Sequence, residues 1–374
     1  FSQQDFVFSL ERTVTVMIIT CPHALGLAIP LVVAMSTAIA AKQGFFIRNR
    51  TPFEAAHKVD AVLIDKTGTL TKGQFGVAAT RVLADDLDEA GLLNLAGAVE
   101  SRSEHPIARA MAAAADNPPA AGDFEAIPGA GAKAQVEGSE IMVVSRRYME
   151  QNGKQIPEGL ADELAQGGRT LAFVLRDDQI VGAVALEDVV RDESARAVAG
   201  LKAMGMRVMM LTGDNEVVAK SVAGRLGLDE WFAEAAPEDK AGKVKELQSR
   251  GLTIAMTGDG VNDAPALAQA DVGLAVGAGA DVAIESADVV LVRSNPLDVL
   301  QVLALSRETR RKTIQNLFWA TGYNAVAIPL AAGALAWAGV APSPAVGAVL
   351  MSLSTVIVAV NAKFMKAPEA GGPA

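Results

Sequence analysis

The run from Thr13 to Ala41 places the first constraint on the fold, because it contains no Asp, Glu, Lys or Arg. A straight helix needs roughly 20 apolar residues to cross a bilayer, and this run is longer than that. Pro22 and Pro30 interrupt it, and a proline removes a backbone hydrogen bond from a helix. Nothing in it resembles the short apolar core and cleavage site of a signal peptide. We therefore expect a membrane span that is kinked or locally unwound.

Two further apolar runs follow towards the other end of the chain. Thr313 to Leu335 is apolar except for Gln315, Asn316 and Asn324, and Ala345 to Ala362 forms the next run. Positively charged flanks of membrane spans stay on the cytoplasmic side. All three runs have such flanks, which are Lys42, Arg48, Arg50, Arg307, Arg310, Arg311, Lys312, Lys363 and Lys366. We expect three spans with the segment from about Gln43 to about Lys312 in the cytoplasm.

The composition agrees with a membrane protein that also has a large water-facing part. Hydrophobic residues make up 51% of the chain, yet 20% of the residues are charged. The formal net charge of -10 argues against nucleic acid as a partner, because phosphate backbones require clustered Lys and Arg.

The cytoplasmic segment repeats a strand, a polar turn that contains glycine, and a helix. The strand candidates are Val59–Ile64, Met206–Leu211 and Leu252–Met256, and helical patterns lie at Glu193–Met204 and Asp239–Arg250. This repetition predicts an α/β fold with a parallel sheet. The functional site of such a sheet lies at the carboxyl ends of its strands. The fold class is therefore a membrane α-helical part joined to an α/β part.

Residues 76–184 differ from the rest of the cytoplasmic segment in composition and pattern. They are rich in Ala and contain alternating apolar stretches such as Thr170–Leu175. We interpret this region as a second cytosolic domain that is inserted into the first. The expected division is residues 1–46 for the first span, 47–75 and 185–306 for the first cytosolic domain, 76–184 for the inserted domain, 307–366 for two spans, and 367–374 for a disordered tail.

Residues with phosphoryl-transfer chemistry follow the three predicted strands. Asp65 offers a carboxylate that can attack a γ-phosphate, and Thr212 offers a hydroxyl to a phosphoryl oxygen. Asp259 and Asp263 can hold Mg²⁺, and Lys240 can neutralise the phosphoryl charge. A lone Asp after a strand is more often a helix cap, so the assignment depends on the whole set of residues.

The surrounding runs resemble the P-type ATPases, a branch of the haloacid dehalogenase-like superfamily. The runs that carry this resemblance are Asp65–Thr71, Thr212–Asn215, Pro237–Lys240 and Thr257–Asp263. The resemblance implies a Rossmann-type phosphorylation domain, with ATP as substrate and Mg²⁺ as cofactor. It assigns catalysis to Asp65, Lys66, Thr67, Thr212, Gly213, Asp214 and Lys240, Mg²⁺ binding to Asp65, Thr67, Asp259 and Asp263, and a supporting role to Asn262.

Thr67 stands two positions after the nucleophile, where soluble phosphatases of the superfamily usually carry a second Asp as general acid and base. Without that carboxylate, we expect the aspartyl phosphate to be long-lived. In the family, a Thr-Gly-Glu loop on an actuator domain assists dephosphorylation, and we find no Thr-Gly-Glu in this sequence. We therefore expect the actuator domain and the earlier membrane spans to be partners that this chain lacks.

The inserted segment contains a candidate nucleotide site. Glu100 precedes the run Ser103–Pro106, and Gly129 and Gly131 follow it. A histidine can stack on adenine, a carboxylate can accept from the adenine amino group, and glycines let the backbone approach closely. Each signal is weak alone, but together they resemble the nucleotide-binding domain of heavy-metal P-type ATPases. The resemblance implies that Glu100, His105, Gly129 and Gly131 bind ATP.

Cys21 and His23 flank Pro22 inside the first span, where a break in the helix can open an ion site. Candidate ligands in the later spans are Tyr323, Asn324, Met351, Ser354 and Thr355. Each has an ordinary structural interpretation as well, and for Ser354 and Thr355 the two interpretations are equally open. Thiolate, imidazole and thioether favour soft ions such as Cu(I) or Ag(I). The predicted spans contain no carboxylate, which a Ca²⁺ pump would be expected to use.

Cys-Pro-His resembles the signature of one subgroup of heavy-metal P-type ATPases. This subgroup is associated with export of copper, and in some members silver, from the bacterial cytoplasm. The resemblance implies an integral protein of the bacterial cell membrane with its catalytic domains in the cytoplasm. The oxidation state of the copper stays open. Three alternatives also stay open, which are a pump for Zn²⁺, Cd²⁺ or Co²⁺, a soluble phosphatase, and a non-catalytic membrane fragment.

Overall fold

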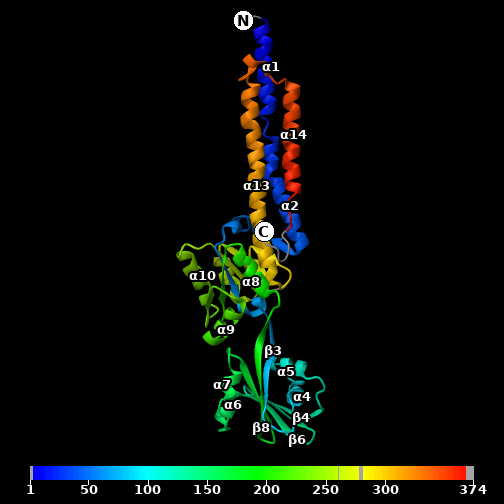
Figure 1. Ribbon diagram of the computed structural model, residues 1–374, viewed down its shortest axis with the longest axis vertical. Helices are drawn as coiled ribbons and strands as arrows, with labels where there is room; N and C mark the ends of the chain where they lie inside the picture. Colours follow the sequence, from blue (N-terminus) through cyan, green and yellow to red (C-terminus); the bar gives the residue numbers. More distant parts are fainter. Residues whose placement is uncertain (1–2, 260, 278–280, 368–374) are drawn as a thin grey trace.

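A helical bundle and two β-sheets follow one another along the long axis of the molecule (Figure 1). The computed structural model describes residues 3–259, 261–277 and 281–367. The predicted motif residue Gly260 and residues 368–374 of the predicted tail at 367–374 therefore lie outside the described residues.

The middle sheet has seven strands in the order β1-β13-β12-β11-β2-β9-β10. The strand β2 (Ala61–Asp65) lies inside the sheet and runs parallel to β11 (Ile254–Gly258) on one side and to β9 (Arg207–Leu211) on the other. The edge pair β1 and β13 is antiparallel. The remaining strands are β1 (Phe45–Ile47), β10 (Glu230–Phe232), β12 (Val272–Val276) and β13 (Val289–Leu291). The predicted α/β fold with a parallel sheet is confirmed.

Side chains of β2 enter two separate apolar cores, because successive residues of a strand point to opposite faces. Val62 and Ile64 share a core with residues of α8 and α9, whereas Ala61 and Leu63 share a core with residues of α10 and α11. Helices on both faces bury the whole strand, which fixes the position of its carboxyl end. The helices are α3 (Arg50–Ala55), α8 (Ser194–Ala203), α9 (Glu216–Leu226), α10 (Asp239–Ser249), α11 (Ala264–Gln269) and α12 (Asp281–Ser286).

The outer sheet has six antiparallel strands in the order β3-β8-β7-β6-β5-β4. Ile141 and Val143 of β6 face α4 and α5, whereas Met142 and Val144 face α6 and α7. The elements are β3 (Thr71–Val82), α4 (Glu89–Glu100), α5 (Pro106–Ala114), β4 (Ala121–Ile127), β5 (Gly131–Val136), β6 (Ser139–Ser145), α6 (Arg146–Gln151), α7 (Leu160–Leu164), β7 (Thr170–Arg176) and β8 (Gln179–Val190).

The long strands β3 and β8 connect the two sheets (Figure 1). Thr71 pairs with Val190 beside the middle sheet, and Val82 pairs with Gly182 in the outer sheet. The predicted limits of the inserted domain, residues 76 and 184, fall inside these two strands, so these limits stay a prediction.

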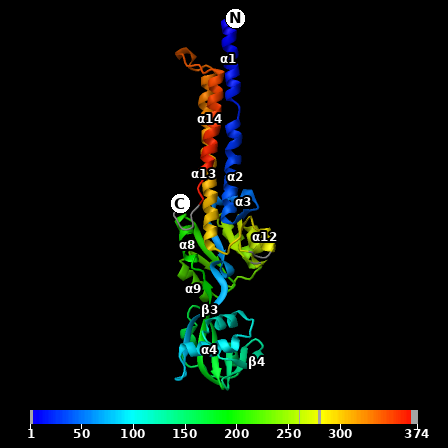
Figure 2. The ribbon, with the colours of Figure 1, turned by 90° about the vertical axis from the view of Figure 1, so that its right-hand side faces the viewer.

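In the bundle, α1 and α2 follow one another end to end, and the long helices α13 and α14 lie beside them (Figures 1 and 2). The four helices are α1 (Gln3–Ile19), α2 (His23–Gln43), α13 (Pro296–Ala331) and α14 (Pro344–Lys363). The predicted break at Pro22 separates α1 from α2. The predicted interruption at Pro30 is wrong, because α2 continues through it. Neighbouring helices can hold a membrane helix together across a proline, and α13 and α14 both pack on α2.

The second predicted span is part of a longer helix. We expected it at Thr313 to Leu335, but α13 begins in the middle domain at Pro296 and ends at Ala331. Its first turns are core residues of the middle domain, and Leu303 and Leu305 are fully buried there. Apolar residues at helical spacing therefore carry the helix without a break from the domain into the bundle.

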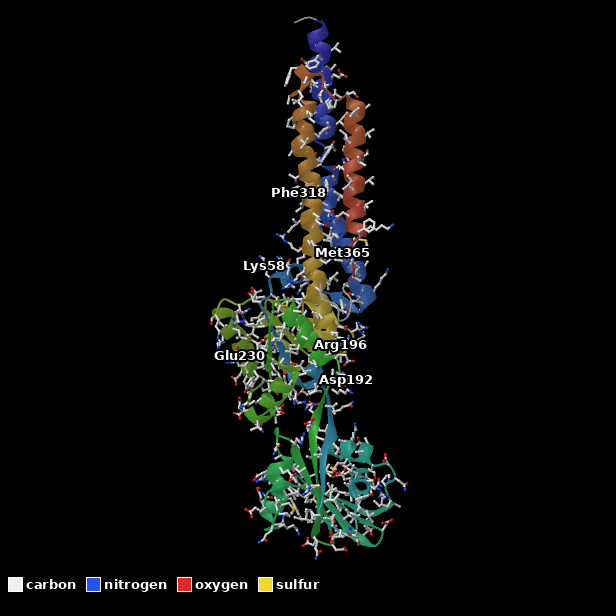
Figure 3. All side chains as sticks on the ribbon, in the orientation of Figure 1. Lys58, Asp192, Arg196, Glu230, Phe318 and Met365 are labelled. Atoms are coloured by element: carbon white, nitrogen blue, oxygen red, sulfur yellow. The ribbon has the colours of Figure 1, made fainter. Side chains whose placement is uncertain are left out.

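The bundle has an apolar surface. The segment Phe6–Gln43 and α14 are each long and apolar enough to cross a membrane. On α13, Phe318 is 71% exposed and Trp319 is 52% exposed. Figure 3 labels Phe318 on this helix. A contiguous apolar surface of this kind is suited to lipid.

We predict opposite effects for alanine at two helical glycines. A Cβ at Gly97 in α4 would stand 2.4 Å from the Cβ of Ala115, so Gly97→Ala should destabilise the fold by about 1–3 kcal/mol. A Cβ at Gly224 in α9 would meet no atom within 4 Å outside the backbone of its own helix, so Gly224→Ala should stabilise the fold by about 0.5–1 kcal/mol. Chemical denaturation of both variants and the wild type measures these differences. Equal effects of the two substitutions would contradict the packing at α4.

Candidate active site and ion site

The carboxyl end of β2 carries Asp65 into a buried charged cluster. Lys240, the second residue of α10, donates from Nζ to Asp65 Oδ1 at 2.6 Å and to Asp263 Oδ1 at 2.7 Å. The exposed fractions of Asp65, Lys240 and Asp263 are 6%, 8% and 2%. The structure thus brings together three predicted site residues that lie far apart in the sequence. A single lysine ammonium group therefore bridges two carboxylates, and because all three groups are buried, water does not screen their charges.

Asp259 completes an acidic group with Asp65 and Asp263. One carboxylate oxygen from each residue lies within 4.8 Å of the others. Converging carboxylate oxygens are the ligands that Mg²⁺ uses, and one lysine cannot balance three carboxylates, so the residues fit a divalent cation. A Cβ on Gly68 would stand 1.7 Å from Asp259 Oδ2, and its φ is +75°. Only glycine therefore fits beside the acidic group at this turn.

Burial raises the pKa of Asp65 to about 7, and the neighbouring carboxylate of Asp263 adds to the increase. Burial, followed by the charge of Asp263, also raises the pKa of Asp259. Burial acts to lower the pKa of Lys240, yet Asp65 and Asp263 outweigh it, so this pKa is raised. A cation between the carboxylates would favour their charged forms, so cation binding and deprotonation of Asp65 should assist one another.

Lys66 is buried and pairs with a second group of carboxylates. Its Nζ lies 2.5 Å from Asp214 Oδ2 and 3.4 Å from Asp188 Oδ2. The hydroxyl of Thr71 also donates to Asp188 Oδ2, at 2.6 Å. Two predicted catalytic residues, Lys66 and Asp214, are therefore in direct contact with each other.

Asp188 and Arg191, at the end of β8, are site residues that the sequence analysis missed. Arg191 donates from Nε to the carbonyl of Thr71 and from Nη2 to the carbonyl of Gly68, both at 3.0 Å. The guanidinium therefore holds the turn that follows Asp65. The available signal was a cluster of charged residues directly after an apolar strand, at residues 187–192.

Thr212 lies at the end of β9 and is buried. The backbone N–H of Asp214 donates to Thr212 Oγ1, and this hydroxyl donates to Asp214 Oδ2, both at 3.1 Å. Gly213 lies between them. The side chains of Thr67 and Asn262 are exposed, and no described contact joins either one to the acidic group. The roles assigned to Thr67, Gly213 and Asn262 stay predictions.

Two candidate nucleotide residues lie at the ends of adjacent helices. Glu100 is the last residue of α4 and is buried. His105 precedes α5, and its exposed imidazole accepts at Nδ1 from the backbone N–H of Ile107 at 3.3 Å. Burial raises the pKa of Glu100 to about 7. A buried carboxylate and an exposed ring near each other in the chain suit a purine, and the assignment of both residues to ATP stays a prediction.

The two candidate glycines have different surroundings. A Cβ at Gly131 would stand 2.0 Å from the carbonyl oxygen of Val143, so strand packing alone explains this glycine. Gly129 has a φ of +68°, and a Cβ at this position would meet no atom within 4 Å, so its backbone borders open space. Helix α4, which ends at Glu100, packs on β6 and on β5, the strand that Gly131 begins.

The break between α1 and α2 brings two soft-metal ligands together. Cys21 Sγ lies 2.8 Å from His23 Nδ1. Met351 of α14 and Cys21 line the same shallow apolar cavity, together with Val14, Met17 and Ile18. The structure thus places the predicted thiolate beside the imidazole, and the predicted thioether on the same cavity as the thiolate.

The other candidate ion ligands differ in their hydrogen bonding. Tyr323 Oη and Ser354 Oγ are buried without a hydrogen-bond partner among the described residues, so both oxygens are free to bind a ligand. Thr355 Oγ1 donates to the carbonyl of Met351 at 3.2 Å, which is the ordinary behaviour of a helical threonine. No described contact joins Asn324 to Cys21, and its role stays a prediction.

The sheet order and the acidic site at the strand ends define the class of protein. A family model described as haloacid dehalogenase-like hydrolase matches residues 59–271, which is more than half of the chain. The chain belongs to this family.

The similar proteins are P-type ATPases. Over 97% of its length the chain is 56% identical to Copper-exporting P-type ATPase B of Archaeoglobus fulgidus, and covers 52% of that protein. Over 96% of its length it is 46% identical to Copper-exporting P-type ATPase B of Enterococcus hirae, and covers 49% of that protein. The chain spans about half the length of the curated relatives it matches.

A crystal structure of a zinc-transporting PIB-type ATPase in the E2.Pi state has the same fold. It is 34% identical, with a TM-score of 0.81 over 97% of this chain and 58% of that chain. The similarities confirm the predicted resemblance to heavy-metal P-type ATPases.

We predict that Glu100 makes stability depend on pH. Its folded-state pKa of about 7 lies above its ordinary value of 4.5, so the folded state binds the proton more tightly. The wild type should lose stability as the pH rises from 4.5 to about 7. Glu100→Gln removes this loss. Denaturant titrations should show the variant gaining about 1–3 kcal/mol on the wild type between pH 5 and pH 8.

The neighbouring Glu104→Gln is the matched control, because the side chain of Glu104 is 88% exposed. Its stability difference from the wild type should be the same at both pH values. A pH-independent difference for Glu100→Gln as well would contradict the burial of the Glu100 carboxylate.

Proposed function

We propose that this chain is the catalytic and ion-conducting part of an ATP-driven pump that moves copper ions across a bacterial membrane. One observation carries the proposal, which is that a single chain joins the Asp65 cluster to the Cys21–His23 pair in a broken apolar helix. ATP, Mg²⁺ and a copper ion are then its small-molecule partners.

Asp65 supplies the nucleophile. One oxygen of its deprotonated carboxylate forms a bond to the γ-phosphorus while the bond to the bridging oxygen of ADP breaks, which leaves an aspartyl phosphate and ADP. The ammonium group of Lys240, 2.6 Å from Asp65 Oδ1, offsets charge on the phosphoryl oxygens. Asp65, Asp259 and Asp263 would hold Mg²⁺, which supplies further charge neutralisation.

Thr67 favours a pump over a phosphatase. A phosphatase needs a carboxylate near the aspartyl phosphate to activate water, and a threonine hydroxyl is a poor general base at neutral pH. The aspartyl phosphate would therefore persist until a further group attacks it. The apolar bundle also argues against a soluble phosphatase.

The donors at the helix break support copper. A thiolate and an imidazole 2.8 Å apart, with a thioether on the cavity that the thiolate lines, suit soft and borderline ions. The copper-exporting relative of Archaeoglobus fulgidus is 56% identical, against 34% for the zinc-transporting structure. Zinc is therefore the second candidate, and silver shares the preference for soft donors.

The proposed location is the bacterial cell membrane, with both sheets in the cytoplasm. Basic residues flank the bundle at the end that joins the middle domain. Because the chain spans about half the length of its curated relatives, we propose that an actuator domain and further spans complete the pump. Asp65 phosphorylation needs only this chain, whereas export needs the complete pump.

Phosphorylation of the chain in lipid nanodiscs tests the proposal. With radiolabelled ATP and Mg²⁺, we expect acid-stable, hydroxylamine-sensitive labelling that increases with Cu(I) and is lost in Asp65→Asn. The control Asp192→Asn alters an exposed carboxylate outside the cluster and should keep the label. Labelling that persists in Asp65→Asn would exclude the nucleophile, and stimulation by Zn²⁺ alone would replace copper by zinc.

A further inference from the structure

A series of hydrogen bonds crosses the bundle between the helix break and the middle domain. Lys312 Nζ donates to Asn361 Oδ1 at 3.0 Å, and Asn361 Nδ2 donates to Asn316 Oδ1 at 2.8 Å. Asn316 Nδ2 then donates to the backbone carbonyl of Ala28 at 3.1 Å. The bonds join α13 to α14 and α13 to α2. We call Lys312, Asn316 and Asn361 the amide relay.

Asn316 is the central residue of the amide relay. Its side chain is fully buried, with an exposed fraction of 0%. Its amide oxygen accepts a hydrogen bond from α14 and its amide nitrogen donates one to α2, so one side chain is bonded to two neighbouring helices. A buried amide without partners is unfavourable in apolar surroundings, and hydrogen bonds of this kind attach membrane helices to one another. Loss of Asn316 would therefore release both attachments.

Small side chains allow a close approach of the helices beside the amide relay. Ala24 and Ala28 of α2, Ala320 of α13 and Val358 of α14 form one small cluster there, and Leu31 and Leu317 pack against it. Small residues let membrane helices approach closely. Hydrogen bonds are directional, so those of Asn316 add a restraint on the axial position of α2 against α13 to this apolar packing.

The amide relay lies just beyond the candidate ion ligands. Ala28 follows His23 by five residues, which is about 7.5 Å along a helix. Tyr323 follows Asn316 by seven residues on α13, which is about 10 Å. A change in the position of α2 against α13 would thus change the position of His23 relative to Tyr323.

On its other side, the amide relay is connected through α13 to the middle domain, which contains Asp65. Ser306 Oγ donates to the carbonyl of Phe53 at 2.7 Å, and Arg307 Nη1 donates to the carbonyl of Met204 at 2.7 Å. These bonds fasten α13 to the middle domain, and the same continuous helix then reaches Lys312 and Asn316. A displacement of the domain would therefore move the amide relay.

We propose that Lys312, Asn316 and Asn361 are positioning residues that fix α2 against α13 and so connect the Asp65 domain to the Cys21–His23 pair. The inference rests on the proposed function, since it takes this pair to bind the transported ion. The amide relay acts through the carbonyl of Ala28 and not through contact with the ion.

Copper affinity of the chain in lipid nanodiscs tests the amide relay. The dissociation constant for Cu(I) is measured by competition with a chromophoric chelator, for the wild type, Asn316→Ala, Asn361→Ala and the double variant. Each single substitution should weaken binding roughly three- to tenfold, which is the range for an interhelical hydrogen bond in a bilayer. The double variant should be no weaker than Asn316→Ala, because the two residues act as one unit.

Thr309→Val is the matched control. Thr309 is buried on the same helix, but its hydroxyl donates to the carbonyl of Leu305 within α13, at 2.7 Å. This variant should bind Cu(I) within twofold of the wild type. Labelling of Asp65 by ATP without copper should be unchanged in all variants, while the copper concentration for half-maximal labelling should increase in the amide relay variants alone.

The outcomes separate the two proposals. Failure of the wild type to bind Cu(I), or equal binding by Cys21→Ser, would overturn the proposed function and the amide relay with it. Binding that depends on Cys21 but is unchanged in Asn316→Ala would overturn the amide relay alone. A lower melting temperature with an unchanged dissociation constant would give Asn316 a merely structural role. Asn361→Ala, at a half-buried position, keeps the test decisive if Asn316→Ala does not fold.

Discussion

Three carboxylates share one buried lysine, and the chemistry of the active site depends on this shortage of positive charge. Lys240 bridges Asp65 and Asp263, while Asp259 adds a third negative group within 4.8 Å. Burial and mutual repulsion raise the pKa of Asp65 to about 7. The site is therefore arranged to gain a cation, and a Mg²⁺-bound phosphate brings that cation together with the atom that Asp65 attacks.

Two long elements leave the middle domain in opposite directions. The strand β3 begins at Thr71, directly after the turn that follows Asp65, and leads with β8 to the outer sheet. The helix α13 begins in the middle domain and continues into the bundle. The domain that contains Asp65 thus lies between the candidate nucleotide site and the candidate ion site (Figure 1). Two continuous strands join it to one site and a continuous helix joins it to the other, and such rigid elements can carry coupling between distant sites.

Much of this arrangement is predictable because the carboxyl ends of parallel strands lie at the same edge of the sheet. The runs after Asp65, Thr212 and Asp259 predict one shared site, since each follows an apolar strand. The amide relay and the contacts at the end of β8 are not predictable in this way, because they join residues that are distant in the sequence. Thr71 and Asp188, for example, are separated by 117 positions, and nothing in the sequence around either residue indicates their hydrogen bond.

The helices show a second limit of prediction. A proline can end a helix or be accommodated inside one, and the neighbours decide which occurs. Pro22 ends a helix here, whereas Pro30 lies inside α2, where α13 and α14 support it. The extent of α13 was missed for a related reason. Its first turns have the composition of a soluble core and its last turns that of a span, so the sequence indicates two elements where the chain forms one.

Chemical trapping shows whether Asp65 accepts the phosphoryl group. After incubation with Mg²⁺ and ATP, sodium borohydride reduces an aspartyl phosphate to homoserine, which mass spectrometry of peptides can locate. We predict homoserine at position 65 and unmodified aspartate at positions 259 and 263. Homoserine at either of those positions, or none at position 65 under conditions in which ATP is consumed, would contradict the account.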